Sequence, residues 1–358
     1  MTVCIEIDRS RRLDEGAPGG HNRWHPDIPP VLAVDPGEVV TFELRDSRDG
    51  TITRASTHED LLAVPALAHP LTGPLEVRGA MPGDVLEVEV LGYETDDFAW
   101  TAIWPGSGFL GDLFDRPFLA RWELDGEHAR SEEVPGVAVP AGVFAGVIGV
   151  APSRELFAHV LEREADLAAR GGDFELPDPE RAVPPAAADG LRTYPPRENG
   201  GNVDIRDLVA GSRLLLPVHA PGALLSIGDL HFAQGDGEVC ISAIETGGSA
   251  TVRVGLRRDG WRPRFPAWES PPRAKRGCFA TTGIPLDDDG RNEQLDLNLA
   301  TRRALLEMLD WLRHEHGLER EAAYVLMSAA VEIRVSELVD KPNALVSAAL
   351  PLDVFERS

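Results

Sequence analysis

Residues 228–238 read Gly-Asp-Leu-His-Phe-Ala-Gln-Gly-Asp-Gly-Glu. This stretch contains a strand pattern, a turn signal and four ionisable side chains. The pattern predicts one strand over residues 224–232 and a second over residues 239–244. Asp236-Gly237 between them is a strong signal for a two-residue hairpin, because a type I′ turn needs positive φ at both central residues. Since side chains alternate between the faces of a strand, Asp229 and His231 are expected to share one face.

The register of this predicted hairpin decides which polar groups meet. With an even loop, His231 lies opposite Ser242 or Cys240, and Glu238 shares its face. With a three-residue loop, Gln234 lies opposite Glu238 instead. Either register gathers polar groups where apolar side chains would otherwise pack, which is costly unless the groups are paired or bind a metal ion. A metal site and a buried hydrogen-bond network both fit these residues.

The strand pattern extends outward from this stretch. Three segments combine a Pro-Gly turn with an alternating strand, over residues 36–44, 82–90 and 221–227. Residues 251–256 predict another strand, with Arg253 facing outward. The 35 glycines and 29 prolines indicate frequent turns. Together these patterns predict a mainly β fold with some α (α+β), in which the Pro-Gly strand units form a sandwich or barrel-like architecture.

Helical patterns are fewer and mark the predicted organisation. Ser153 is expected to cap a helix over residues 154–170, and residues 299–316 and 319–332 predict a C-terminal helical pair before a last strand at 345–350. Residues 173–197 are rich in Pro and Ala and predict a connecting loop. This loop would join an N-terminal mainly-β domain (1–172) to a C-terminal β domain with the helical pair (198–358), and the site would be shared between them.

Charge and composition exclude several classes of function. The net charge of −24 argues against nucleic acid and anionic membrane surfaces as partners, because both are bound by clustered cations. No apolar run is long enough to span a bilayer, and residues 1–12 lack a signal-peptide pattern, so we expect a cytoplasmic protein. The 3 cysteines lack zinc-ligand spacing. Neither lysine fits a Glu-Lys-Cys or Ser-Ser-Lys amidase site, and no Gly-x-Gly-x-x-Gly dinucleotide motif follows a strand.

Three further clusters contain residues that could bind a substrate or a metal ion. Asn202 and Asp204 follow a Gly pair that allows close approach of a ligand, although the same pattern also fits a turn before a capped helix. Residues 21–30 place Trp24 and His25 before a Pro-rich segment that favours an extended backbone. Residues 69–74 are either a rigid turn or a pocket loop that carries His69 and Thr72.

These motifs together resemble the acetamidase/formamidase family over most of the chain. The segment 228–238 is similar to the most specific signature of that family. The other matching segments are residues 200–205, 69–74, 79–86 and, for the formamidase branch, 21–29. The branch's His-Pro-Gly before the Ala-Pro-Ser segment is missing at residues 144–153. The N-terminal motif is therefore formamidase-like, while the middle is acetamidase-like.

The resemblance implies a homo-oligomer that hydrolyses a small linear amide, formamide or acetamide, to ammonia and the acid. A larger or cyclic amide, another C–N bond, and a non-catalytic β-sandwich that binds a small ligand are the alternatives.

Our hypothesis for the site is a divalent metal ion, zinc by preference, that activates water. The catalytic candidates are Glu238, which would handle protons, Asp229 and Gln234. The candidate metal ligands are His231, Asp229, Asp204 and His25. The candidate substrate-binding residues are His69, Thr72, Trp24 and Asn202.

Overall fold

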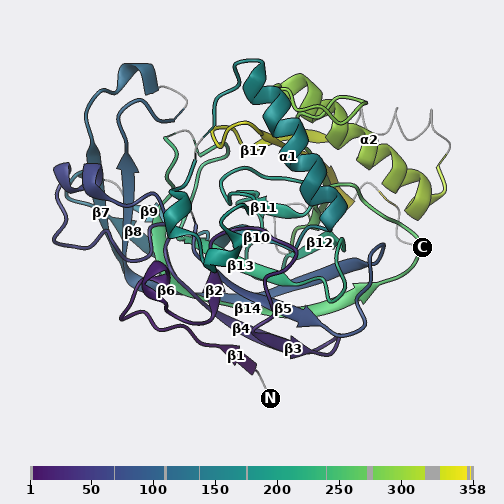
Figure 1. Ribbon diagram of the computed structural model, residues 1–358, viewed down its shortest axis with the longest axis horizontal. Helices are drawn as coiled ribbons and strands as arrows, with labels where there is room; N and C mark the ends of the chain where they lie inside the picture. The colour runs from purple at the N-terminus through teal and green to yellow at the C-terminus, as the bar shows by residue number, and fades with distance from the viewer. Residues whose placement is uncertain are drawn as a thin grey trace.

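The computed structural model describes residues 3–67, 69–108, 111–136, 138–174, 176–238, 240–271, 277–318, 331–352 and 355. These residues form 18 strands, joined by hydrogen bonds into one mostly antiparallel sheet, and two α-helices (Figure 1). The predicted mainly β fold with some α is therefore confirmed.

One group of strands is built around β14 (Glu245–Arg257), in the lower part of Figure 1. β14 pairs along its whole length with β6 (Val85–Ile103), and its other edge pairs with β4 (Val39–Leu44). β1 (Val3–Ile5) lies beside β4. From β6 the sheet continues, in spatial order, through β12 (Arg213–Pro217), β15 (Ala267–Glu269), β16 (Cys278–Gly283), β18 (Leu345–Pro351) and β17 (Glu332–Glu337).

A second group is built around β13 (Leu225–His231), which meets β14 only at its last residues. β13 pairs with β10 (Phe144–Gly149) and with β5 (Leu71–Val77). The outer members are β11 (Gly200–Asn202), β2 (Gly20–His21) and β3 (Leu32–Val34). One hydrophobic core joins both groups, including Phe42 of β4, Val252 of β14 and Ile227 of β13. The alternating strands thus bury one face of each group against the other, as in a sandwich.

The remaining strands form a lobe at the left of Figure 1. There β6 pairs with β7 (Phe118–Leu124), which leads to β8 (His128–Arg130) and β9 (Val139–Pro140). Short 3-10 helices lie in the connections: η1 (Leu13–Glu15), η2 (Glu59–Ala63), η3 (Gly111–Leu113), η4 (Pro179–Arg181) and η5 (Pro185–Ala187).

Two of the predicted helices are present, with bounds within two residues of those predicted. α1 (Arg154–Ala169) is capped by Ser153, whose Oγ accepts a hydrogen bond from the amide of Leu156 at 3.0 Å. α2 (Leu297–His316) ends at Gly317, which has the left-handed conformation. α2 packs on β16 and β18, where Gly283 lacks the Cβ that would collide with the helix backbone. The second predicted C-terminal helix falls on residues 319–330, outside the described residues, and Glu332 begins β17.

The predicted hairpin at Asp236-Gly237 is wrong. Its first strand is present as β13, but the partner of His231 in the ladder is Glu245, and residues 239–244 are not a strand where described. Positive φ at Glu238 and Ile241 breaks the extended backbone. Gly237 instead pairs with Glu337, and its amide donates to the carbonyl of Ser336 at 3.2 Å. The turn residues therefore lie within a long loop that is held by β17.

Two other predictions bear on the layout. Where described, residues 173–197 are irregular apart from η4 and η5, and residues 191–197 are buried. The division into two domains at this segment stays a prediction. Among the described helices, none combines the length and apolarity that crossing a membrane requires.

Candidate active site

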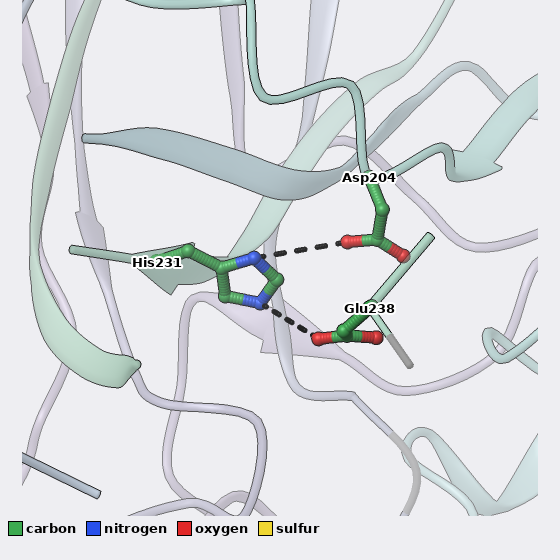
Figure 2. A group of neighbouring side chains, drawn as sticks. All are labelled: Asp204, His231 and Glu238. Atoms are coloured by element: carbon green, nitrogen blue, oxygen red, sulfur yellow. Dashed lines mark ion pairs between the residues drawn. The ribbon is translucent and has the colours of Figure 1, made fainter. Parts of the chain in front are cut away.

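His231, at the end of β13, lies at the centre of a buried cluster of carboxylates. Its Nδ1 is 3.7 Å from Oδ1 of Asp204, and Figure 2 shows Glu238 on the opposite side of the ring, 3.9 Å from Nε2. Nε2 is also 3.2 Å from Oδ2 of Asp229 and 3.4 Å from Oε2 of Glu245. All five side chains are less than a tenth exposed. We call these five residues the acid–imidazole cluster.

The backbone of β13 and β10 creates the space for the acid–imidazole cluster. Asp229 has a φ of 57°, so it interrupts the regular alternation and points its carboxylate towards His231. Gly146 on β10 faces this point, and a Cβ there would lie 2.6–2.7 Å from atoms of Asp204, Asp229 and His231. The carbonyl of Gly146 also accepts a hydrogen bond from the amide of Asp204 at 3.2 Å. Gly146 therefore leaves space for the side chains of the cluster, and its carbonyl holds the backbone of Asp204 in place.

Glu245 is the cluster member that the sequence reasoning missed. It is the first residue of β14 and lies opposite His231 in the ladder. Its carboxylate accepts hydrogen bonds from Ser47 Oγ at 2.8 Å and from the amide of Ala243 at 3.0 Å. The sequence around it, Glu-Thr-Gly-Gly-Ser, gave no clear signal, and the predicted hairpin register placed other residues opposite His231.

The charges of the cluster are strongly coupled. Burial, reinforced by neighbouring carboxylates, raises the pKa of Asp204 and of Glu238 well above their usual values, and raises that of Glu245 to about 7. Burial opposes a charged His231, but Glu245 and Asp229 outweigh it and raise the pKa of the imidazole well above its usual value. Four carboxylates around one imidazole thus hold excess negative charge that only protons or a cation could neutralise.

The donor set fits a divalent metal ion. Ligand atoms of Asp204, His231 and Glu238 lie within 4.8 Å of one another, and so do those of Asp229, His231 and Glu245. Both ring nitrogens of His231 and both oxygens of Asp204 lack a hydrogen bond to the residues that the structure describes. Buried atoms of this kind carry a free-energy cost that coordination would remove. Imidazole and carboxylate ligands suit zinc and similar ions.

Glu238 and Gln234 connect the cluster to a hollow of about 700 Å³. The side-chain amide of Gln234 donates to the carbonyl of Asp204 at 3.2 Å. Its Oε1 is buried and has no hydrogen-bond partner in the described part of the chain. Both residues line the hollow, so a ligand there would lie beside residues that contact the cluster.

The structure brings His69 close to this cluster. The His69 ring interacts electrostatically with Asp229 and packs edge-on against Tyr194, with 5.1 Å between the centroids. Burial lowers the pKa of His69 to about 4, so the ring is neutral near pH 7. Its Nδ1 is buried and unpartnered among described residues. Its proposed contact with substrate stays a prediction.

The other predicted site residues lie further out. Asn202 donates to Asp340, which interacts electrostatically with Asp204. Thr72 donates to the carbonyl of Glu43 at 2.6 Å and pairs with Ile227 across β5 and β13.

The N-terminal motif packs against α1 rather than contacting His231. Trp24 is buried in a hydrophobic cluster with Val160 of α1. His25 packs edge-on against Phe157 of α1 and lies 3.7 Å from Asp189. His25 is in neither group of neighbouring ligand atoms, and its role as a metal ligand stays a prediction.

Comparisons with known proteins agree with this picture. A sequence model described as the Acetamidase/Formamidase family matches residues 6–357. The formamidase of Methylophilus methylotrophus is 35% identical, covering 99% of this chain and 94% of the relative. The acetamidase of Mycolicibacterium smegmatis is also 35% identical, covering 92% and 89% respectively. Among solved structures, the gamma lactamase from Delftia acidovorans has a TM-score of 0.73 at 33% identity, covering 100% of this chain and 94% of that one.

Proposed function

Since this chain belongs to the acetamidase/formamidase family, we propose that its acid–imidazole cluster is the centre that hydrolyses small amides. The chain is a hydrolase of carbon–nitrogen bonds in linear amides, and its products are ammonia and the carboxylic acid. The observation that carries the proposal is the contact of one buried imidazole with four buried carboxylates beside a hollow. Such a concentration of perturbed groups is typical of catalytic sites.

A divalent metal ion, which we propose to be zinc, fits the cluster. His231 would hold it either with Asp204, which lies on the Nδ1 side of the ring, or with Asp229 and Glu245, which lie on the Nε2 side and form one group of neighbouring ligand atoms with it. The chemistry that such an ion supplies when bound is polarisation of the amide carbonyl and a lowered pKa of water. The hydrogen bonds from Ser47 and Ala243 hold the Glu245 carboxylate in place towards His231.

The protein's own groups handle the protons and orient the substrate. Hydrolysis adds water across the C–N bond, so one proton must move from the water to the departing nitrogen. Glu238 accepts that proton on its carboxylate and returns it to the nitrogen, because it is the cluster's carboxylate that also lines the hollow. The free Oε1 of Gln234 accepts a hydrogen bond from the substrate NH₂ group. Burial of the cluster strengthens these interactions by excluding water.

We also propose where the enzyme is located, how it assembles and what it binds. The net charge of −24 disfavours nucleic acid and anionic membranes as partners. We propose a cytoplasmic homo-oligomer whose partner is a small amide, with its site assembled from both sides of residues 173–197. Ser47 and His69 come from the N-terminal side, and His231 comes from the C-terminal side.

The test is ammonia release from formamide and acetamide, measured beside elemental analysis of the purified protein. We expect ammonia from at least one of these amides, about one divalent ion per chain, and loss of activity after chelation that zinc restores. A protein that binds amides but releases no ammonia from any of them would support the non-catalytic alternative. If His25→Ala lowers the metal content, His25 is a ligand as predicted from the sequence.

A further inference from the structure

The hollow beside Glu238 is much larger than formamide or acetamide. Its volume is about 700 Å³, within the range of pockets that hold drug-sized ligands. A water molecule occupies about 30 Å³ in the liquid, so acetamide, with four non-hydrogen atoms, would occupy on the order of 100 Å³. Most of the hollow would then remain filled with water.

Part of the wall of the hollow is apolar. It is formed by side chains that belong to or pack against one hydrophobic cluster, namely Trp122, Ile244, Val139 and Ala233. The polar atoms in this wall are already satisfied: the indole N–H of Trp122 donates to Thr101 Oγ1 at 3.0 Å, and Thr101 donates to the carbonyl of Ala243 at 2.6 Å. A ligand against this wall therefore meets hydrocarbon surface and no unsatisfied polar atom of these residues.

The same hollow is also lined by two polar residues that contact the cluster. Gln234 has a buried Oε1 without a partner among the described residues, and the carboxylate of Glu238 lies 3.9 Å from His231. An amide group bound beside Glu238 would lie next to both residues. Its acyl substituent would then extend along the apolar wall and displace water from it, which is favourable in proportion to the apolar area covered.

We infer that the preferred substrate is a primary amide whose acyl group is apolar and larger than methyl, such as an alkyl chain or an aromatic ring. The inference rests on the proposed function, because it assumes that the cluster hydrolyses amides. The similarity to a protein named a gamma lactamase is consistent with it, since a lactam is also a larger amide than acetamide.

The test measures kcat/KM for formamide, acetamide, butyramide, hexanamide and benzamide by ammonia release. Each added methylene that reaches the wall should raise kcat/KM about fourfold, so hexanamide should exceed acetamide by at least about tenfold. Ala141→Trp fills the hollow from an exposed position and should bring the ratio of hexanamide to acetamide close to one. Ala138→Trp, three residues away and also exposed but outside the hollow, should leave the ratio unchanged.

The outcomes separate the two proposals. If acetamide is hydrolysed but longer amides are equal or poorer substrates, the inference about the acyl group is overturned and the proposed function stands. An unchanged ratio in the Ala141→Trp protein would assign the preference to another part of the molecule and would equally overturn the inference. If no amide releases ammonia, both the proposed function and the inference are wrong.

Discussion

Glu238 is the residue at which the cluster and the hollow meet, since it lies 3.9 Å from His231 and lines the hollow. Glu238→Gln keeps the shape but cannot accept a proton, so we expect kcat for amide hydrolysis to fall by about 10²- to 10⁴-fold. Gln also resembles the neutral form of Glu238 that burial favours in the metal-free protein, so the melting temperature of the chelated protein should not decrease.

A matched control is Glu127→Gln, which changes an exposed glutamate in a loop and should keep full activity. A Glu238→Gln protein that retains wild-type turnover on short amides would contradict the proton-transfer role.

Gly146 has the second residue-scale role, because it leaves the space that three cluster members occupy. In Gly146→Ala the new Cβ would collide with Asp204, Asp229 and His231. We expect metal affinity and activity each to fall by at least about tenfold, as when groups that orient metal ligands are changed. Gly92→Ala is the control, since its Cβ would meet nothing within 4 Å and its φ is not positive. Equal metal affinity in the two variants, measured by titration, would show that Gly146 does not determine how the side chains of the acid–imidazole cluster are arranged.

Residue chemistry alone could indicate part of this site. The spacing of Asp229 and His231 on one strand predicts that they lie close together, and the structure places them 3.2 Å apart, although the positive φ of Asp229 rather than regular alternation directs its carboxylate. Gly146 could not be found in this way, because its importance depends on contacts with Asp204 and His231, which are remote in sequence. Glu245 was missed because one wrong turn shifted the strand that carries it.

At the scale of elements, α1 is joined to the segment before β11 by buried ion pairs. Arg163 of α1 makes a bidentate pair with Glu198, at 2.6 and 2.8 Å, and Glu164 pairs with Arg192 and Arg197. Burial opposes ionisation of Glu198, but Arg163 outweighs it and lowers the pKa to about 2 from the ordinary 4.5. The ionised pair therefore stabilises the fold above pH 4.5, and this stabilisation is lost as the pH falls towards 2.

Glu198→Gln leaves the charge of Arg163 buried without a partner, so we expect a loss of about 3–5 kcal/mol in the free energy of unfolding at pH 7. The difference from wild type should shrink as the pH falls from 4.5 towards 2. Denaturant unfolding at pH 7 and pH 3 measures this, with Glu162→Gln on the exposed face of α1 as control. A difference that is the same at both pH values would mean that the ion pair is not its source.

The elements differ in how far the sequence determines them. β4, β13, β18 and both helices follow from local periodicity, caps and Pro-Gly turns, and all are present. The hairpin failed because Asp236-Gly237 has a competing partner in β17, which is about a hundred residues away. A local turn signal gives no information about such a distant partner.

At the scale of the whole molecule, the fold concentrates buried acidic groups at one point in a chain with a net charge of −24. The raised pKa values of Asp204, Glu238 and Glu245 stabilise the metal-free protein below their ordinary pKa values. That stability is lost as the pH rises through the raised values, which for Glu245 means from 4.5 to about 7.

A bound metal cation should reverse this loss of stability at high pH, because it neutralises the carboxylates in place of the protons that they have lost. At a zinc concentration about 100 times the dissociation constant, binding should stabilise the fold by about 2.7 kcal/mol, a rise of a few degrees in Tm. Because ligation requires ionised carboxylates, the rise should be larger at pH 8 than at pH 6. Differential scanning calorimetry of chelated and reloaded protein measures it. No rise at either pH with zinc, manganese or cobalt would exclude a metal ion from the cluster.

His231 is the group that all four carboxylates share, so the most direct measurement is the rate of ammonia release from acetamide by His231→Ala at a fixed zinc concentration. His159→Ala, which removes an exposed imidazole from α1, is the matched control. We predict that His231→Ala loses at least about 100-fold in rate and that the control retains wild-type activity. A folded His231→Ala protein that releases ammonia at the wild-type rate would contradict the assignment of hydrolysis to this cluster.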